Sequence, residues 1–356
     1  MLRSSAPGPT RGSITVEIRR GAGMRCRTGQ LRARGRATAA DRGDDMRSVS
    51  NRTRVGLLAA FTAFSALLST GSATAATQLN GDWAPFDRCP VDAPAMLAAD
   101  GINTIATCIA SSSATGSITL GKTEVATGKT DLQLGVVQRA DGTAALVAPP
   151  EGALTADPAE IPGGLLGLMC PSGIPLVSGI CRQLTDNNLN RVTATIEPAG
   201  APRDFRMSAA FSTGEPILTI PVRIHLKNPF LGDKCYIGTT ANPVLLKPQN
   251  TTAPTLSLQR FSADGTPNDD EGEMGRYTFD GADQGDATFA VPGASGCGAG
   301  LLDWAVNLKT GLPSAAGKNS VSLDATTTYF GSPYDPAGLA PDEGRKLSEF
   351  WHSAKR

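Results

Sequence analysis

Acid–base chemistry in this chain would depend on one histidine. The chain has two histidines, and only His225 falls within the predicted core, so a Ser-His-Asp or Cys-His hydrolase would have to use it. Arg223 and Lys227 lie two residues to either side, on the same face of a predicted strand. This cationic row could bind an anionic sugar or a carboxylate, or tune a general base. We favour the alternative that the row is the solvent side of a half-buried strand.

A second candidate site is an acidic segment that could ligate calcium. Its carboxylates are Asp264, Asp269, Asp270, Glu271 and Glu273, and Asp280, Asp283 and Asp286 follow closely. Ca²⁺ takes about six to eight oxygen ligands and is available outside the cell. The spacing does not match an EF-hand loop, so we favour a solvated loop and keep calcium as the one candidate cofactor.

Three common catalytic motifs are missing from the sequence. It contains no Gly-x-Ser-x-Gly elbow, no His-Glu-x-x-His and no Gly-x-Gly-x-x-Gly turn. Their absence favours a binding or structural protein over an enzyme, and we assign no catalytic residue.

The cysteines indicate a disulfide framework. Six of the seven follow the predicted signal peptide, and an even number in an exported chain indicates disulfides. Because short loops close at the lowest entropic cost, we favour the pairs Cys89–Cys108, Cys170–Cys181 and Cys235–Cys297. Metal binding is the weaker interpretation, since there is no Cys-x-x-Cys and histidines are few.

Residues 46–75 have the pattern of a secretory signal peptide. Basic residues begin it, an uncharged stretch from Val55 to Leu68 follows, and an Ala-x-Ala site predicts cleavage between Ala75 and Ala76. The simplest account of residues 1–45, a basic segment without apolar periodicity, is a disordered leader upstream of a misassigned start codon.

The net charge of the mature chain limits the classes of partner that it can bind. Of 33 basic and 33 acidic residues, 13 basic and four acidic ones precede the cleavage site, which leaves 20 basic, 29 acidic and a net charge of −9. Nucleic acids and anionic membranes require a positive surface, so we exclude them as partners. The mature chain contains no second long apolar run, so no transmembrane helix is predicted in it. A secreted protein, extracellular or part of the cell envelope, is the expectation.

The mature chain has the pattern of a mainly β protein. Short alternating runs predict strands at Ser117–Val125, Asp131–Arg139, Thr143–Ala148, Arg191–Glu197, Ile217–Lys227 and Val321–Phe330. Helical composition is confined to Leu301–Leu308 and Asp342–Lys355. Pro221 lacks an N–H, so its strand is predicted to lie at a sheet edge or to be bulged.

These elements predict an antiparallel β sandwich or split barrel with short helices, stapled by disulfides. The secreted domain is expected over residues 76–330, with a possible split in the Pro-rich stretch 149–162. Residues 331–356 are expected to be a C-terminal tail with a short helix.

A resemblance covers residues 217 to 325. The segments His225–Gly232, Cys235–Gly238, Asn242–Pro243 and Gly311–Asn319 resemble a group of uncharacterised secreted proteins of high-GC actinobacteria. The resemblance implies export and a β-rich fold, but no activity and no functional residues.

Two functions follow as hypotheses. The first is a non-catalytic extracellular or cell-wall-associated protein with a binding or structural role. The second is a secreted hydrolase that uses His225. A buried His225 bonded to a carboxylate in a cleft would favour the hydrolase, and an exposed His225 on a flat sheet would favour the binding protein.

Overall fold

The computed structural model describes residues 79, 81–169, 189–336 and 340–355. The predicted leader, the signal peptide and its cleavage site lie outside these residues, as does the predicted Cys170–Cys181 bridge. The described residues form two antiparallel sheets with a few short helices and two disulfides, Cys89–Cys108 and Cys235–Cys297. The expected mainly β, disulfide-stapled fold is confirmed, and these sheets do not close into a barrel.

The ten-stranded sheet, here the large sheet, has the order β12-β14-β16-β1-β4-β5, with β13, β2, β3 and β6 paired beside that path. Its strands are β1 (Thr104–Ser113), β2 (Thr115–Leu120), β3 (Thr123–Thr127), β4 (Thr130–Arg139), β5 (Ala144–Val147), β6 (Leu154–Ala156), β12 (Gln249–Asn250), β13 (Thr255–Phe261), β14 (Met274–Asp286) and β16 (Ser320–Pro333).

The six-stranded sheet, here the small sheet, has the order β15-β10-β9-β8-β7, with β11 paired to β9. Its strands are β7 (Ala159–Glu160), β8 (Thr193–Pro198), β9 (Ile220–Lys227), β10 (Tyr236–Ile237), β11 (Val244–Leu246) and β15 (Ala294–Ser295). The described helices are η1 (Gly81–Phe86), α1 (Pro94–Leu97), α2 (Gly164–Met169), η2 (Met207–Phe211), α4 (Asp303–Thr310) and α5 (Glu343–Ser353).

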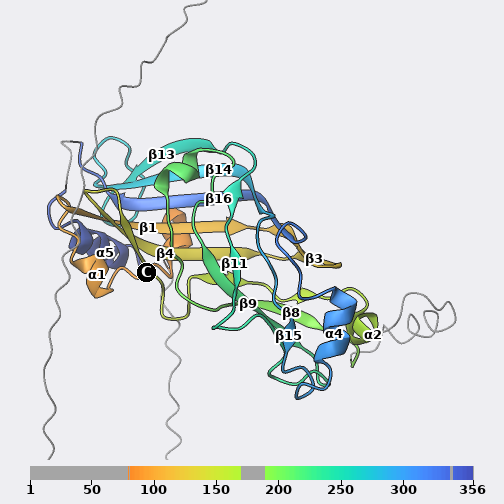
Figure 1. Cartoon of the computed structure of the whole chain (residues 1–356). Helices are drawn as coiled ribbons and strands as arrows, with labels where there is room; N and C mark the ends of the chain where they lie inside the picture. Colours follow the sequence, from red (N-terminus) through yellow and green to blue (C-terminus); the bar gives the residue numbers. More distant parts are fainter. Residues whose placement is uncertain (1–78, 80, 170–188, 337–339, 356) are drawn as a thin grey trace, which may run out of the picture. The chain divides into compact units, whose positions relative to one another are not determined.

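Both faces of the large sheet are covered. On β1, Ile109 joins a core between the two sheets, whereas Cys108 and Ala110 point the other way into a second core with η1, α1 and α5. In Figure 1, α1 and α5 lie together at one end of the large sheet, and the small sheet lies along another part of it. The core between the sheets contains Leu134 and Val222, so residues before and after the stretch 149–162 share one core.

All six segments predicted as strands form strands, and one of them is divided in a way that the sequence did not show. The hairpin across Asp141-Gly142 is confirmed as β4 and β5, and Gly142 has the positive φ (82°) that such a turn needs. The segment predicted as a single strand at Ser117–Val125 is two paired strands, β2 and β3, because the chain reverses at Gly121, which also has a positive φ.

The expectation for Pro221 is wrong. Its strand β9 lies inside the small sheet, flanked by β8 on one side and by β10 and β11 on the other, and its pairing with β8 runs without a bulge. The proline is tolerated because the pairing with β8 stops at this point: β8 ends at Pro198, and only the return hydrogen bond to Ala199 is missing. The carbonyl of Pro221 still accepts a hydrogen bond from the N–H of Ala199.

The C-terminal helix is an integral part of the second core. Leu347, Phe350 and Trp351 of α5 are buried there. The indole N–H of Trp351 donates to the carbonyl of Phe86 at 2.8 Å, which ties the helix to η1. Residues 343–353 therefore pack against the start of the described chain.

Candidate functional site

The small sheet brings Arg223 and His225 together around one carboxylate. Glu197 lies opposite Arg223 in the β8–β9 register. The guanidinium of Arg223 donates to Glu197 Oε2 at 2.9 and 3.1 Å, and His225 Nδ1 lies 3.0 Å from Glu197 Oε1. Because a carboxylate only accepts, Nδ1 carries the proton of this hydrogen bond. Tyr236 on β10 stacks on the imidazole with ring centroids 4.3 Å apart.

A hydrolase was expected to have a buried His225 that is bonded to a carboxylate and lies in a cleft. In the part of the chain that the structure describes, this cluster has the burial and the carboxylate but not the cleft. The His225 side chain is only 12% exposed and bonds a carboxylate, as a general base would. It lies on the outer face of the small sheet and lines neither of the cavities between the sheets. Its Nε2 is buried and, in the described structure, pairs with no serine or cysteine. Lys227 is exposed beside Thr193, outside the cluster.

The acidic segment is a loop between β13 and β14, as predicted, and an arginine occupies its centre. The guanidinium of Arg260 donates to the carbonyl oxygens of Asp269, Asp270 and Gly272 at 3.1, 3.0 and 2.9 Å. These carbonyls already face a positive charge that a bound Ca²⁺ would have to displace. The described residues contain no group of three or more His, Cys, Asp or Glu side chains placed to hold a metal.

The other calcium candidates have separate places. Asp264 accepts hydrogen bonds from the N–H and hydroxyl of Thr266, and Glu271 and Glu273 line a surface groove. The carboxylates of β14 accept from protein donors: Asp280 from Thr327, Asp283 from the N–H of Ala325, and Asp286 from the N–H of Lys247.

One segment has phosphate-loop spacing without the structure that this chemistry needs. Residues Gly116–Thr123 match Gly-x-x-x-x-Gly-Lys-Thr. A phosphate-binding loop joins a strand to a helix, whereas this segment is the β2–β3 hairpin. The turn N–H groups are used within the protein, by Asn319 Oδ1 for Gly121 and by the carbonyl of Thr310 for Lys122.

The space between the two sheets contains a cavity that the sequence did not indicate. Its volume is about 70 Å³, which is room for several waters but about half of the roughly 150 Å³ that holds benzene in an engineered protein cavity. Of its 23 lining residues, 15 are apolar and none is charged. A second, smaller space lies between β2 and β3 on one side and β8 and β9 on the other.

Strand alternation builds the two walls of the larger cavity. Ser111, Leu132 and Thr328 are register partners on β1, β4 and β16, so their side chains share the face of the large sheet that looks toward the small sheet. Ile220, the first residue of β9, and Leu218, two residues before it, belong to the facing wall.

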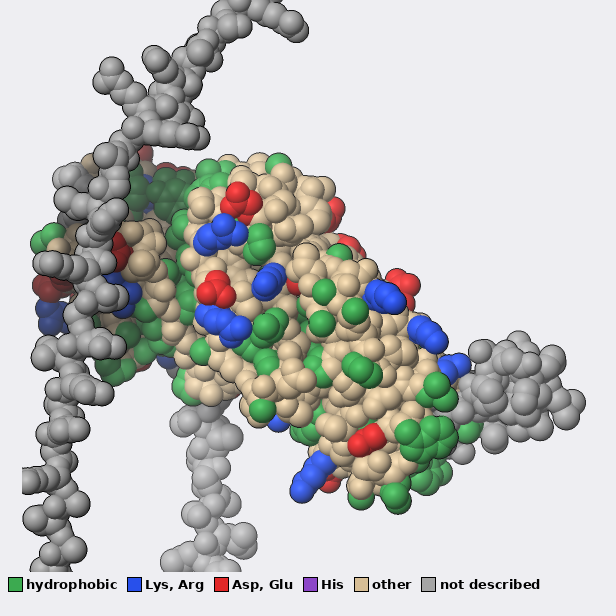
Figure 2. Space-filling view, in the orientation of Figure 1, with side chains coloured by type: hydrophobic (Ala, Val, Ile, Leu, Met, Phe, Trp, Pro, Cys, Tyr) green, Lys and Arg blue, Asp and Glu red, His purple; other side chains and the backbone are tan. Residues whose placement is uncertain are grey.

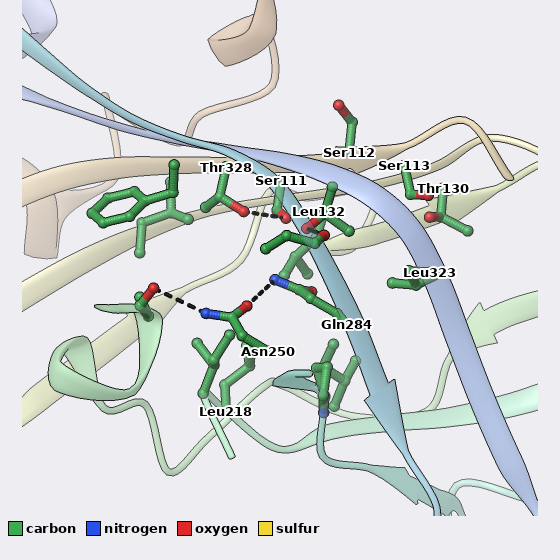
Figure 3. Close-up of a pocket in the computed structure, with 18 of the residues that line it drawn as sticks. Ser111, Ser112, Ser113, Thr130, Leu132, Leu218, Asn250, Gln284, Leu323 and Thr328 are labelled. Atoms are coloured by element: carbon green, nitrogen blue, oxygen red, sulfur yellow. Dashed lines mark hydrogen bonds between the residues drawn. The ribbon is translucent and has the colours of Figure 1, made fainter. Parts of the chain in front are cut away.

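Polar groups gather at one part of the cavity, shown in Figure 3. Ser111 Oγ and Thr328 Oγ1 are 2.7 Å apart, and either can donate. Gln284 Nε2 donates to Asn250 Oδ1 at 3.1 Å. Both amides are buried, with exposed fractions of 8% for Gln284 and 2% for Asn250. An apolar cavity with a few convergent polar groups is the usual form of a small-molecule site.

Comparisons with known proteins gave no match: no family model, no curated protein and no solved structure matches this chain. The resemblance over residues 217 to 325 therefore stays a prediction. In the described part of the chain, no helix is both long and apolar enough to cross a bilayer.

Sequence reasoning missed Glu197, Tyr236 and all of the cavity residues. A polar residue in an alternating run, such as Glu197, signals only a solvent-side position. The contact between Glu197 and His225 depends on which strands pair and in which register. The sequence did not indicate the place of Gln284, because its strand, the bulged β14, was not predicted.

Proposed function

We propose that the mature chain is a secreted, non-catalytic binding protein that holds a small, largely apolar molecule between its two sheets. The cavity between the sheets is the observation that carries this proposal. Secretion is supported by the predicted signal peptide and by two buried disulfides, which persist in oxidising compartments.

The lining of the cavity indicates the ligand's bulk chemistry. Burial of apolar surface contributes roughly 25 cal/mol per Å², so an apolar body in contact with Leu134, Leu218 and Phe279 would be stabilised by its removal from water. Ser111, Leu132, Leu154, Phe205 and Thr328 are only partly buried, so the cavity is not sealed on every side.

Toluene is a probe of this cavity that needs more than its present volume, so its binding also requires the partly buried side chains of Leu132 and Phe205 to move outward. We expect it to bind the folded protein with a dissociation constant in the range of about 0.1–1 mM and to raise Tm as its concentration rises. Isothermal titration calorimetry and thermal unfolding measure both effects. Absence of saturable toluene binding would contradict the proposal.

A filling variant and a matched control locate the binding. Leu132→Phe adds volume to a partly buried side chain that lines the cavity, so we expect toluene affinity to fall about 10-fold. Leu308→Phe makes the same change on α4, where the leucine is 72% exposed and lies outside the cavity. Figure 2 shows hydrophobic side chains on the surface at the end of the molecule where α4 lies. Toluene should bind this control like the wild-type protein; an equal loss in both variants would place the binding elsewhere.

The hydrolase remains the second candidate because Glu197 holds His225 as the acid of a catalytic triad holds its histidine. His225→Ala separates the two functions. If the protein is non-catalytic, the variant loses about 1–2 kcal/mol of stability, with the Glu197 hydrogen bond and the Tyr236 contact, and still binds toluene.

The matched control is His352→Ala, which removes the other histidine, a partly exposed partner of Asp92. Hydrolysis of 4-nitrophenyl acetate by the three proteins is the readout. A rate that the wild-type protein and His352→Ala share, and that His225→Ala loses by about 100-fold, would favour the hydrolase and overturn the non-catalytic proposal.

A further inference from the structure

We infer that the molecule held between the sheets is uncharged and carries a hydroxyl or primary amide group, which donates to Gln284 Oε1 and accepts from the Ser111–Thr328 hydroxyl pair. This inference rests on the proposed function and names the ligand class for the same cavity. Its basis is the hydrogen-bond capacity that the protein leaves unused there.

The absence of charge in the lining excludes a charged ligand group. No Asp, Glu, Lys, Arg or His lines the larger cavity. A carboxylate or ammonium group placed there would lose its hydration without gaining an opposite charge, which costs far more than burial of a hydrogen-bonded hydroxyl. Fatty acids and amines are therefore poor ligands, whereas alcohols and amides remain.

The hydrogen-bond network fixes the orientation of the Gln284 amide. Asn250 Nδ2 donates to the carbonyls of Ala210 and Ser212 at 3.0 and 3.2 Å, which uses both of its hydrogens. Asn250 Oδ1 must then face Gln284 and needs a donor, so Gln284 presents Nε2 to it at 3.1 Å.

This orientation leaves Gln284 Oε1 as a free acceptor. In the described structure Oε1 receives no hydrogen bond from the protein, although the residue is 92% buried and lines the cavity. An acceptor in that position favours a ligand group that donates a hydrogen.

The hydroxyl pair supplies the complementary donor. Ser111 and Thr328 have two hydroxyl hydrogens between them, and their mutual 2.7 Å hydrogen bond uses one. The second hydrogen is available to a ligand acceptor. Figure 3 shows both hydroxyls and Gln284 among the side chains that surround the same cavity. A group that both donates and accepts, a hydroxyl or a primary amide, matches this arrangement.

Four ring compounds of nearly equal size test the ligand class: toluene, benzyl alcohol, benzoate and benzylammonium. We expect benzyl alcohol to bind at least as tightly as toluene, because hydrogen bonds in the cavity offset the dehydration of its hydroxyl. Benzoate and benzylammonium should bind at least about 100-fold more weakly than benzyl alcohol. The readout is calorimetric titration of the wild-type protein at pH 7.

The results separate this inference from the proposed function. If toluene does not bind, the proposed function fails and this inference fails with it. If toluene binds but benzyl alcohol binds about 10-fold more weakly, as expected for a purely apolar cavity, only the inference is wrong. Tight binding of either ion would also overturn it.

Two variants test the named groups. Gln284→Met keeps the size of the side chain and removes the acceptor, so benzyl alcohol should bind about 10-fold more weakly while toluene stays within about threefold. Because this change also removes the donor to Asn250, Ser111→Ala combined with Thr328→Val provides a second test that leaves the amide pair intact. Wild-type ratios of benzyl alcohol to toluene affinity in both variants would contradict the inference.

Discussion

Glu343→Gln is expected to stabilise the protein at pH 8 by about 3 kcal/mol and to leave its stability at pH 4 nearly unchanged. Glu343 begins α5 and is 5% exposed, and its Oε2 is buried with no hydrogen-bond partner in the described structure. The pKa of Glu343 is raised from 4.5 to about 7. Burial is the largest cause, a hydrogen bond from the backbone of Ala106 lowers the pKa, and the nearby charge of Asp100 raises it.

The sign of the pH dependence follows from the direction of the pKa shift. Because the pKa of Glu343 is higher in the folded state, the folded protein binds the proton more tightly than the unfolded chain. The stability that this proton contributes is fully present below pH 4.5, and it is lost as pH rises from 4.5 through about 7. Glutamine is neutral throughout, so the variant should lose this part of the pH dependence.

Urea unfolding at pH 4, 6 and 8 measures the effect. The matched control is Glu349→Gln, an exposed carboxylate on the same helix, which should change the free energy of unfolding by less than about 0.5 kcal/mol at each pH. A stability difference between Glu343→Gln and the wild-type protein that stays constant over pH 4–8 would show that Glu343 does not titrate in this range.

Removal of the Cys235–Cys297 bridge by alanine at both positions is expected to cost about 4 kcal/mol. The two cysteines are 62 residues apart, and a cross-link over a loop of this length removes about that much conformational freedom from the unfolded chain. The bridge joins the segment before β10 to the segment after β15, at the edge of the small sheet, and both sulfurs are buried.

The second bridge provides the matched control. Cys89–Cys108 spans only 19 residues, so its removal in the same way should cost about 3 kcal/mol, less than the longer bridge. Urea unfolding measures both losses, and intact mass before and after reduction counts the bridges in protein from culture medium. Equal stability of the bridged and unbridged proteins, or free thiols at these four positions, would contradict the prediction.

Local patterns in the sequence determined much of the secondary structure. Strict alternation predicted β9, Asp141-Gly142 predicted the β4–β5 hairpin, and both helices predicted from composition are present as α4 and α5. Short-range closure predicted the two disulfides that the structure describes. These features depend on residues near one another in the chain, or on an entropy that depends on loop length, so the sequence alone carries them.

The surroundings of each candidate site residue came only from the tertiary structure. His225 is bonded to Glu197 and stacked on Tyr236 because β8 and β10 pair with β9 in one particular register. The same holds for Arg260, which fills the acidic loop from the adjoining strand.

The cavity shows the limit of sequence reasoning most clearly. Ser111 and Gln284 are far apart in the chain, and the sequence around each of them is ordinary for a strand. Whether two sheets pack fully or leave a space between them depends on the volumes of side chains from many strands at once. The sequence therefore determined many of the strands and the two described bridges, and only the packing determined the cavity, its free acceptor on Gln284 and the buried carboxyl of Glu343.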